Sequence, residues 1–156
     1  MKFELPTKAS QEVLSIDARE IEAMLQGPKL DIPPFPECQL TLKDGRILYI
    51  REAKLEEVPA MLGYMEKLMK VEHDFYDLVG SRVYSEILGW KLKRLKDVYT
   101  LVGLIDGVWA GFANGRLVNE DINISLHTMA LMRGGRIGAA MYYAKAFYGM
   151  EIIGNK

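Results

Sequence analysis

The chain is predicted to be an α/β protein of the α+β type, with a mixed, mainly antiparallel sheet flanked by helices. Three observations indicate this class: two Asp-Gly hairpin signals, three segments with apolar residues at helical spacing, and a Gly-rich run between a strand and a helix. A length of 156 residues with 49% hydrophobic residues is typical of one globular domain. One core of useful size is therefore expected.

Residues 1–37 are predicted to form an N-terminal arm, and residues 38–156 the folded domain. Asp17 to Glu20 has the pattern of a capping box, which would start a short helix ending near Gln26. The following stretch, PKLDIPPFP, contains four prolines. Such a stretch favours an extended, stiff connector.

The first half of the domain is predicted to hold a hairpin and then two helices. The strands Gln39–Leu42 and Arg46–Ile50 flank an Asp-Gly turn. The first helix starts near Val58 and has Pro59 in its first turn, where the missing N–H does little harm. Ser81 is expected to cap the second helix, whose predicted apolar face comprises Tyr84, Ile87, Leu88, Leu92 and Leu95.

The second half is predicted to be a strand meander that ends in a helix. Val98–Ile105 and Val108–Leu117 surround a second Asp-Gly turn, and Asp121–Met132 forms the next strand. A third helix then begins within the Gly-rich run, and Gly149–Lys156 is expected to be a final strand. The inward face of the third helix is predicted to comprise Ile137, Ala140, Met141, Ala144 and Phe147.

The Gly-rich run before the third helix has the chemistry of an anion site. A turn between a strand and a helix exposes several backbone N–H groups at the positive end of the helix dipole. Three glycines, Gly134, Gly135 and Gly138, allow close approach of a phosphate, and Arg133 and Arg136 add charge-assisted hydrogen bonds. A purely structural Gly-rich turn is the alternative for the same residues.

Two common nucleotide loops do not fit this run. A P-loop requires Lys followed by Ser or Thr after its last glycine, and the chain has Ala139 and Ala140 there. The dinucleotide fingerprint requires a βαβ unit, whereas an antiparallel meander precedes this loop.

Three segments in order resemble the GNAT superfamily of acyl-CoA-dependent N-acyltransferases, over residues 46–154. Arg46–Ala53 (RILYIREA) is similar to the family's opening strand. Asp106–Ala113 (DGVWAGFA) is similar to its middle hairpin. Arg133–Gly138 (RGGRIG) is similar to its pyrophosphate motif, except that Arg136 replaces the motif's first glycine.

The resemblance implies an N-acyltransferase that moves an acetyl or other acyl group from acyl-CoA to a small-molecule or peptide amine. A non-catalytic acyl-CoA sensor or scaffold of the same fold is the alternative, and a structural domain with an empty loop is a third hypothesis. In the N-acyltransferase, the resemblance implies that the backbone of Thr128, Met129 and Ala130 holds the pantetheine and polarises the thioester carbonyl. The implied pyrophosphate-binding residues are Arg133, Gly134, Gly135, Arg136, Ile137, Gly138 and Ala139.

The catalytic base is harder to place. The family's usual base positions hold Ile122 and Ile124, which cannot take a proton, so Glu120, with the same strand parity, is the candidate. A solvated turn carboxylate is the alternative for Glu120. His127 has the opposite parity, so it is expected to be a packing histidine unless a bulge reverses the facing.

The acceptor is expected to enter between the first two helices. His73, Asp74 and Tyr76 lie there in the sequence, where the family often builds its acceptor site. A simple connecting loop with aromatic anchors is the alternative. No metal site is predicted.

The family's later elements are almost wholly absent, so the fold is predicted to be C-terminally truncated and no general acid is placed. The last strand would then be an unpaired edge. Either the chain is a fragment of a longer protein, or a homodimer forms through this strand.

Composition excludes other classes of function and partner. A net charge of −1 and a pI near 6.1 argue against a nucleic-acid scaffold. Cys38 is the only cysteine, which fits a reducing cytoplasm, and no apolar stretch reaches the roughly 18 residues of a membrane span. A cytoplasmic location without membrane attachment is therefore expected.

Overall fold

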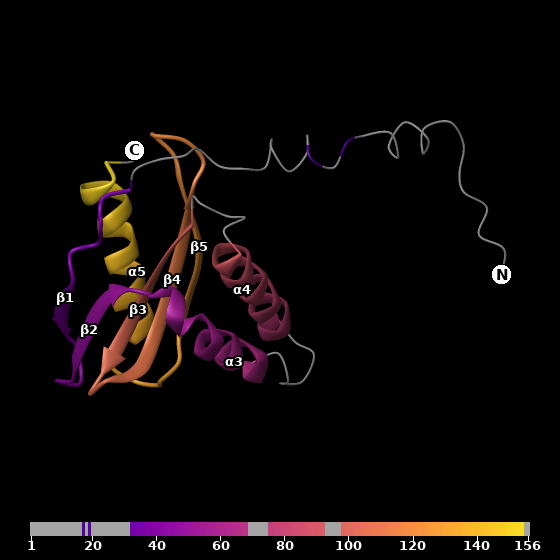
Figure 1. The fold of residues 1–156 in the computed structure, drawn as a ribbon. Coiled ribbons are helices and arrows are strands. Elements are labelled where there is room, and N and C mark those ends of the chain that lie inside the picture. The colour runs from indigo at the N-terminus through magenta and orange to yellow at the C-terminus, as the bar shows by residue number, and fades with distance from the viewer. Residues whose placement is uncertain (1–16, 18, 20–31, 69–74, 93–97, 155–156) are drawn as a thin grey trace, which may run out of the picture.

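Five strands form one antiparallel sheet in chain order, as the computed structural model shows (Figure 1). The structure describes Asp17, Arg19 and residues 32–68, 75–92 and 98–154. The strands are β1 (Cys38–Thr41), β2 (Ile47–Glu52), β3 (Val98–Ile105), β4 (Val108–Leu117) and β5 (Asn123–Ala130). All four pairings are antiparallel, so β1 and β5 lie at the two edges. The predicted α+β class and its antiparallel sheet are confirmed.

Helices cover both faces of this sheet (Figure 1). The 3-10 turn η1 (Leu55–Glu57) leads into α3 (Val58–Leu68), and α4 (Phe75–Lys91) packs against α3. Helix α5 (Ile137–Phe147) lies on the opposite face and contacts β4 and β5 most extensively. The sheet therefore has an α3/α4 face and an α5 face.

Both predicted Asp-Gly hairpins are confirmed. Gly45 has φ +87°, and Asp106 and Gly107 have φ +51° and +76°. In the second turn, positive φ at both central positions matches the right-handed twist of the flanking strands. The strands β3 and β4 therefore have the predicted bounds.

The 3-10 turn η1, which leads into α3, is capped by the side chain of its own third residue, Glu57. The Glu57 carboxylate accepts a 2.8 Å hydrogen bond from the Lys54 N–H and pairs with Arg51 at 2.6 Å. The guanidinium holds the pKa of Glu57 below its usual value. This contact caps the start of η1, where the Lys54 side chain makes no capping hydrogen bond.

The predicted start of the second helix is wrong. Helix α4 already begins at Phe75, six residues before Ser81. Ser81 lies inside the helix, where its carbonyl accepts a 2.9 Å bond from the Ser85 hydroxyl, an arrangement that interior serines tolerate. The apolar face is also turned, since Val83 and Ile87 are buried whereas Leu92 is 57% exposed.

The predicted final strand is wrong over its described part. Helix α5 continues as a π turn, η2, over Tyr148–Ile152. Continuing the helix buries the Tyr148 ring against Phe35 and Tyr99, and its hydroxyl donates to the Pro33 carbonyl at 2.7 Å. A homodimer built on strand pairing at this segment therefore lacks its strand in residues 148–152.

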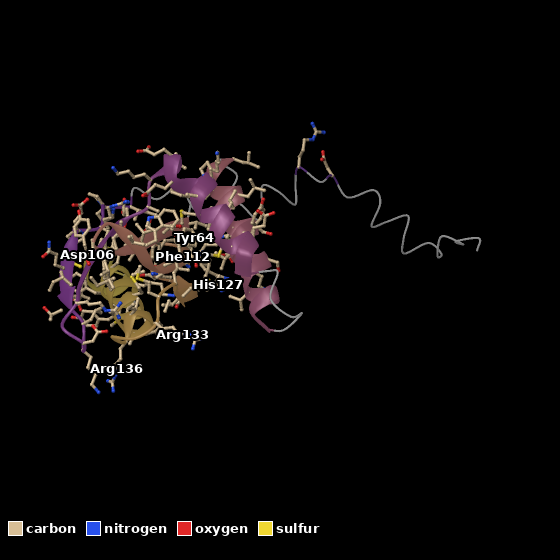
Figure 2. The ribbon with its side chains drawn as sticks, turned by 90° about the horizontal axis from the view of Figure 1, so that it is seen from below. Tyr64, Asp106, Phe112, His127, Arg133 and Arg136 are labelled. Atoms are coloured by element: carbon tan, nitrogen blue, oxygen red, sulfur yellow. The ribbon has the colours of Figure 1, made fainter. Side chains whose placement is uncertain are left out.

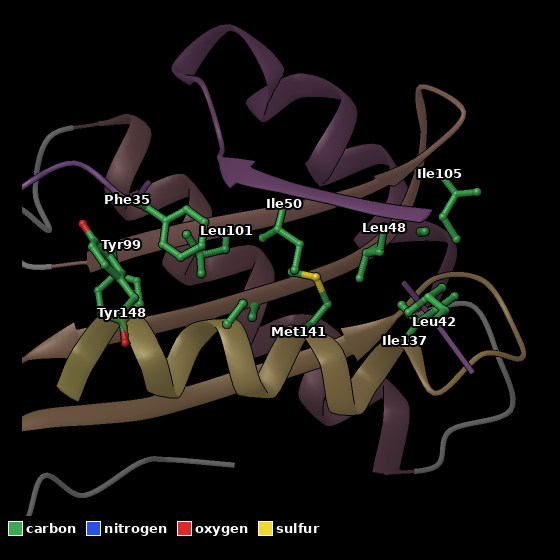
Figure 3. Close-up of a cluster of buried hydrophobic side chains, with 13 residues drawn as sticks. Phe35, Leu42, Leu48, Ile50, Tyr99, Leu101, Ile105, Ile137, Met141 and Tyr148 are labelled. Atoms are coloured by element: carbon green, nitrogen blue, oxygen red, sulfur yellow. The ribbon is translucent and has the colours of Figure 1, made fainter. Parts of the chain in front are cut away.

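The core on the α5 face is the larger of two (Figure 3). Met141 lies at its centre, against β3 and β4 at glycines: a Cβ on Gly103 or Gly111 would lie 2.6 or 2.7 Å from the Met141 side chain. The buried residues here are Phe35, Leu42, Leu48, Ile50, Tyr99, Leu101, Ile105, Ala110, Ala113, Ile137, Met141, Ala144 and Tyr148. The core on the α3/α4 face comprises Ala53, Val58, Met61, Met65, Val83, Ile87, Val102 and Phe112.

Candidate functional site

The loop after β5 reverses the chain into α5 through three consecutive left-handed residues. Gly134, Gly135 and Arg136 have φ +89°, +61° and +62°. Two of the three are glycines, which adopt this region at little cost, whereas Arg136 as the N-cap adopts it with a side chain. Arg136 therefore fits the loop despite replacing the glycine of the family motif.

Backbone N–H groups of this loop are left without partners. Within the described chain, no hydrogen bond uses the N–H of Gly135, Arg136, Gly138 or Ala139. Unpaired N–H groups at the first turn of a helix carry the positive end of its dipole. The loop therefore presents a set of donors suited to an anion.

Hydrogen bonds connect the β1–β2 turn to this loop. The Lys43 N–H donates to the Gly135 carbonyl at 3.3 Å, and Arg46 Nη2 donates to the Arg133 carbonyl at 3.1 Å. A Cβ on Gly135 would lie 2.8 Å from the Asp44 carboxylate, so a side chain at this position would displace that carboxylate. Arg46 pairs with Asp44 at 2.7 Å and lowers the pKa of that carboxyl. This ion pair offsets the unfavourable effect of Asp44 on a bound anion.

Two cationic side chains flank the loop. Arg133 and Arg136 are exposed and extend from the same end of the molecule (Figure 2). Neither forms an ion pair with any residue in the described ranges. Both guanidinium groups are therefore available to an anion at the loop.

The first turn of α5 is anchored next to β5. Ile137 is 1% exposed and belongs to the α5-face core. A Cβ on Gly138 would lie 4.0 Å from the Ala130 Cβ, which is ordinary contact, while Ala139 is exposed. The turn is thus held firmly on one side and open on the other.

Strand β5 is an edge strand, with no strand on its outer side in the described chain. Its inner side pairs with β4, and the Leu131 N–H donates to the Ala110 carbonyl at 2.8 Å. Because inward and outward backbone groups alternate in an antiparallel pair, those of Thr128 and Ala130 point outward and those of Met129 inward. Two of the three predicted pantetheine positions are therefore at the edge.

A β-bulge interrupts β5 just before this edge segment. Ala113 pairs with Thr128 and Gly115 with Ser125, so β5 has two residues where β4 has only Asn114. A bulge re-aims side chains. The His127 ring consequently lies on the α3/α4 face (Figure 2). The expectation of a packing histidine assumed regular alternation along the strand, and the bulge breaks that alternation.

His127 belongs to a polar cluster with Glu86 and Asn114. His127 Nε2 lies 3.2 Å from Glu86 Oε1, and Asn114 Nδ2 donates to Glu86 Oε2 at 2.6 Å. The fully buried Asn114 side chain also accepts the His127 N–H at 2.9 Å. Because the carboxylate can only accept, Nε2 carries the hydrogen and Nδ1 is left free to take a proton.

Lys145 fixes the bulge from the α5 face. Its Nζ donates to the His127 carbonyl at 3.0 Å, so both backbone groups of His127 are held by side chains. The Lys145 side chain is buried, and burial lowers its pKa to about 8. The sequence reasoning missed this residue, although a lysine four positions after Met141, on the apolar helix face, was a usable signal.

Glu86 and Asn114 were also missed, because they meet His127 only in the folded chain. They lie on α4 and β4, 41 and 13 positions away from it. The bulge that brings them together has no pattern in the sequence of β5.

The structure does not bring Glu120 to the predicted thioester position. Glu120 lies in the exposed turn between β4 and β5. Strand β5 begins three residues later, at Asn123, and the five strand positions from Asn123 to Thr128 span roughly 16 Å. His127, adjacent to Thr128, is the nearer titratable group.

Of the three predicted acceptor residues, Tyr76 belongs to the part of the chain that the structure describes. Tyr76 lies in the first turn of α4, not in a connecting loop. His73 and Asp74 lie outside the described residues, as does most of the predicted arm.

The described residues form neither a metal-binding cluster nor a membrane-spanning helix. Among the residues that the structure describes, no three His, Cys, Asp or Glu side chains gather where they could hold a metal ion. No helix in the described ranges combines the length and apolarity needed to cross a membrane.

Comparisons with known proteins give distant structural likenesses. No family model matches the chain, and no curated protein matches it in sequence. An uncharacterised protein (bh2621) from Bacillus halodurans has a TM-score of 0.49 at 15% identity, over 76% of this chain and 68% of that one. The PaiA N-acetyltransferase from Thermoplasma acidophilum, solved with coenzyme A, has a TM-score of 0.40 at 13% identity, over 65% and 71%. These likenesses place no ligand and no activity on this chain.

Proposed function

We propose that this protein is an acyl-CoA-dependent N-acyltransferase that binds the pyrophosphate of acetyl-CoA, or of another acyl-CoA, at the loop Arg133–Ala139. The observation that carries the proposal is the set of four unpaired N–H groups at the start of α5, next to two exposed arginines. Backbone donors at a helix N-terminus and nearby guanidinium groups are the two usual means of holding phosphate.

The position of the loop supports an acyl-CoA ligand over a free phosphate. The outward backbone of Thr128 and Ala130 continues from the loop along the edge of β5. A pantetheine arm carries amides that can pair with such an edge as an added strand does. The three sequence segments that resemble the GNAT superfamily point to the same ligand.

His127 is proposed as the general base. The acceptor amine attacks the thioester carbonyl of acyl-CoA, and His127 Nδ1 takes the proton that the amine loses. The C–S bond then breaks, the amide forms, and CoA leaves as the thiolate. Glu86, at 3.2 Å from Nε2, holds the ring in the required tautomer and stabilises the charged imidazolium. Asn114 keeps Glu86 in place.

The acceptor amine is proposed to arrive on the α3/α4 face. The His127 ring lies on this face, and its side chain is 14% exposed, so one side remains accessible. Tyr76 lies in the first turn of α4, and His73 and Asp74 directly precede this helix in the sequence. They stay as proposed contributors to acceptor specificity.

Binding is tested with two matched pairs of variants. Gly138→Asp should abolish acetyl-CoA binding because it adds a negative charge at the helix start, whereas Gly138→Ala has room beside Ala130 and should still bind. Arg133→Ala should weaken binding by about 1.5–3 kcal/mol, and Lys91→Ala, on exposed α4, should not. Titration calorimetry with unchanged affinity in Gly138→Asp and Arg133→Ala would exclude this loop.

Catalysis is tested with acetyl-CoA and a panel of amines. His127→Gln keeps a donor for Glu86 but cannot take a proton, so kcat should fall by roughly 10²–10⁴ with the acetyl-CoA affinity unchanged. Glu120→Gln should leave kcat as it is. Loss of turnover in Glu120→Gln alone would reverse the assignment, and binding without any turnover would identify an acyl-CoA sensor instead.

A further inference from the structure

One described helix, α5, covers the face of the sheet on which it lies, whereas α3 and α4 together cover the other face (Figure 1). Five strands about 4.8 Å apart make a surface roughly 19 Å wide, and a helix with its side chains is about 10 Å across. One helix therefore leaves part of its face of the sheet uncovered. The uncovered part includes a groove between α5 and the edge strand β1, lined by the apolar side chains of Phe35, Cys38, Leu40, Tyr143, Ala144 and Phe147.

The outer side of α5 lacks the charges that a solvent-facing helix normally carries. Its one charged residue, Lys145, points inward and is 3% exposed. Helix α4, by comparison, exposes Arg82 and Lys91. A helix that is apolar on all sides is normally buried, so the outer side of α5 has the character of an interface.

Large apolar side chains gather on this outer side of α5 and form an outer patch. Tyr143 and Phe147 are one helical turn apart and are 62% and 38% exposed, and Tyr142 beside them is 56% exposed. Met150, 64% exposed, lies at the rim of the patch, in η2. Side chains of this size offer roughly 150–250 Å² each, so these exposures leave on the order of 400 Å² open to solvent. That is about half of the ~800 Å² that each partner contributes to a standard protein interface, before the groove is counted.

We infer that the outer patch and the groove beside it form an interface with a second copy of this chain, across a two-fold axis. A two-fold interface brings the same surface of both copies together, so this surface must complement itself. An uncharged apolar patch meets the condition, because no like charges face each other across the axis. Aromatic and Met side chains, with few charges among them, are also typical of homodimer interfaces.

The groove next to the patch gives each copy both halves of the contact. Tyr143 and Phe147 form one side of the groove, and Leu40 on β1 lies on the other side. An aromatic ring of the second copy fills the groove, and the groove of that copy receives a ring in return. A tyrosine suits this position because its ring can be buried while its hydroxyl stays in contact with water. No residue proposed for acyl-CoA binding or proton transfer takes part, so the inference does not rest on the proposed function.

Sedimentation equilibrium of the full chain tests whether the second copy binds. The expected mass is twice the 17.7 kDa of one chain at high protein concentration, and it should fall toward that of one chain on dilution. The mass of one chain at every concentration up to millimolar would overturn the inference.

Two matched substitutions locate the interface. Tyr143→Glu puts a carboxylate on both sides of the two-fold axis, so the dimer dissociation constant should rise roughly hundredfold or more. Leu92→Glu makes the same change at a 57% exposed apolar position after α4 and should dimerise as the wild type does. Far-UV circular dichroism checks that both variants fold. A folded Tyr143→Glu variant that is still dimeric would refute this surface, and Gly138→Asp should remain dimeric, which separates this result from acyl-CoA binding.

Cys38 reports on the groove directly, because it is the one cysteine of the chain and lines the groove. Its alkylation by iodoacetamide at constant pH should slow as rising protein concentration drives the wild type into the dimer. In Tyr143→Glu the rate should stay at the value of the dilute wild type. A rate independent of concentration in a dimeric wild type would place the interface elsewhere and refute the proposal.

Discussion

The two faces of the sheet carry different kinds of chemistry. On the α5 face, the loop and helix that would hold acyl-CoA are adjacent in sequence, and Met141 packs between the glycines of β3 and β4. On the α3/α4 face, the polar cluster joins Glu86, Asn114 and His127 from three separate elements. The loop before α5 is built from residues adjacent in the sequence, so a local motif can predict it. The polar cluster of His127 is built from residues that only the fold brings together, so no local motif predicts it.

The largest expected effect concerns packing on the α5 face. Met141→Ala should lower the free energy of unfolding by about 2–5 kcal/mol, because the residue is fully buried and backbone glycines around it cannot move in to fill the space. Met65→Ala, on the α3/α4 face, should cost less, since two helices there can shift. Urea unfolding measures both, with the 64% exposed Met150→Ala as the control. A larger loss for Met65→Ala would reverse the comparison.

A smaller loss of unfolding free energy is expected for substitutions in the polar cluster of His127, Glu86 and Asn114. Asn114→Ala leaves the His127 backbone N–H and the Glu86 Oε2 atom without their partner, which should cost about 2–4 kcal/mol. Glu86→Gln keeps one oxygen for Asn114 Nδ2, and its NH₂ group can donate to His127 Nε2 in the other tautomer, so it should cost only about 1 kcal/mol. Chemical unfolding of the two variants provides the measurement. Equal stability of Asn114→Ala and the wild type would mean that the cluster does not hold the bulge.

The pH dependence of stability should reveal Lys145, which links the two faces through the His127 carbonyl. Its pKa falls from an ordinary 10.5 to about 8 in the folded protein because burial disfavours the ammonium. Between these values the unfolded chain binds more protons, so stability should rise with pH from about 8 to 10.5, by at most roughly 3 kcal/mol. The groups that face Lys145 are Tyr99 on β3 and Tyr142 on its own helix.

The measurement is the difference in unfolding free energy between wild type and Lys145→Met across this pH range. Taking the difference removes the titration of the tyrosines and Cys38, which both proteins share. A flat difference would show that Lys145 is not desolvated.

The smallest effect is expected at the β1–β2 turn. Asp44→Asn removes the carboxylate beside Gly135, so acetyl-CoA should bind a few-fold more tightly at low salt, and the gain should vanish at high salt. Calorimetry at two salt concentrations measures it. Weaker binding would show that Asp44 orders the loop rather than opposing the anion.

Local signals in the sequence predicted most of the fold, including the turn between β5 and α5. Asp106-Gly107 defined the β3–β4 hairpin, and the run from Arg133 predicted both the turn and the start of α5. The apolar spacing of Ile137, Met141 and Ala144 correctly identified the buried face of that helix, whereas Phe147, also expected to face inward, is 38% exposed.

The misses arose where contacts far apart in sequence decide the structure. Tyr148 extends α5 because its ring meets Phe35 and Tyr99, so the expected strand at Gly149–Lys156 did not form over residues 149–152. The bulge at His127 exists because Asn114 and Lys145 satisfy its backbone. Neither partner is visible within the β5 sequence, so the role of His127 could not be derived from strand parity.

The most direct test of the central claim is an amide NMR titration of the protein with coenzyme A. The account predicts saturable shifts of the Gly135, Arg136, Gly138 and Ala139 N–H groups, because these are the unpaired donors at the start of α5. Thr128 and Ala130 should follow them along the edge of β5. Shifts confined to other parts of the chain, or none at millimolar coenzyme A, would contradict the assignment of this loop as the acyl-CoA site.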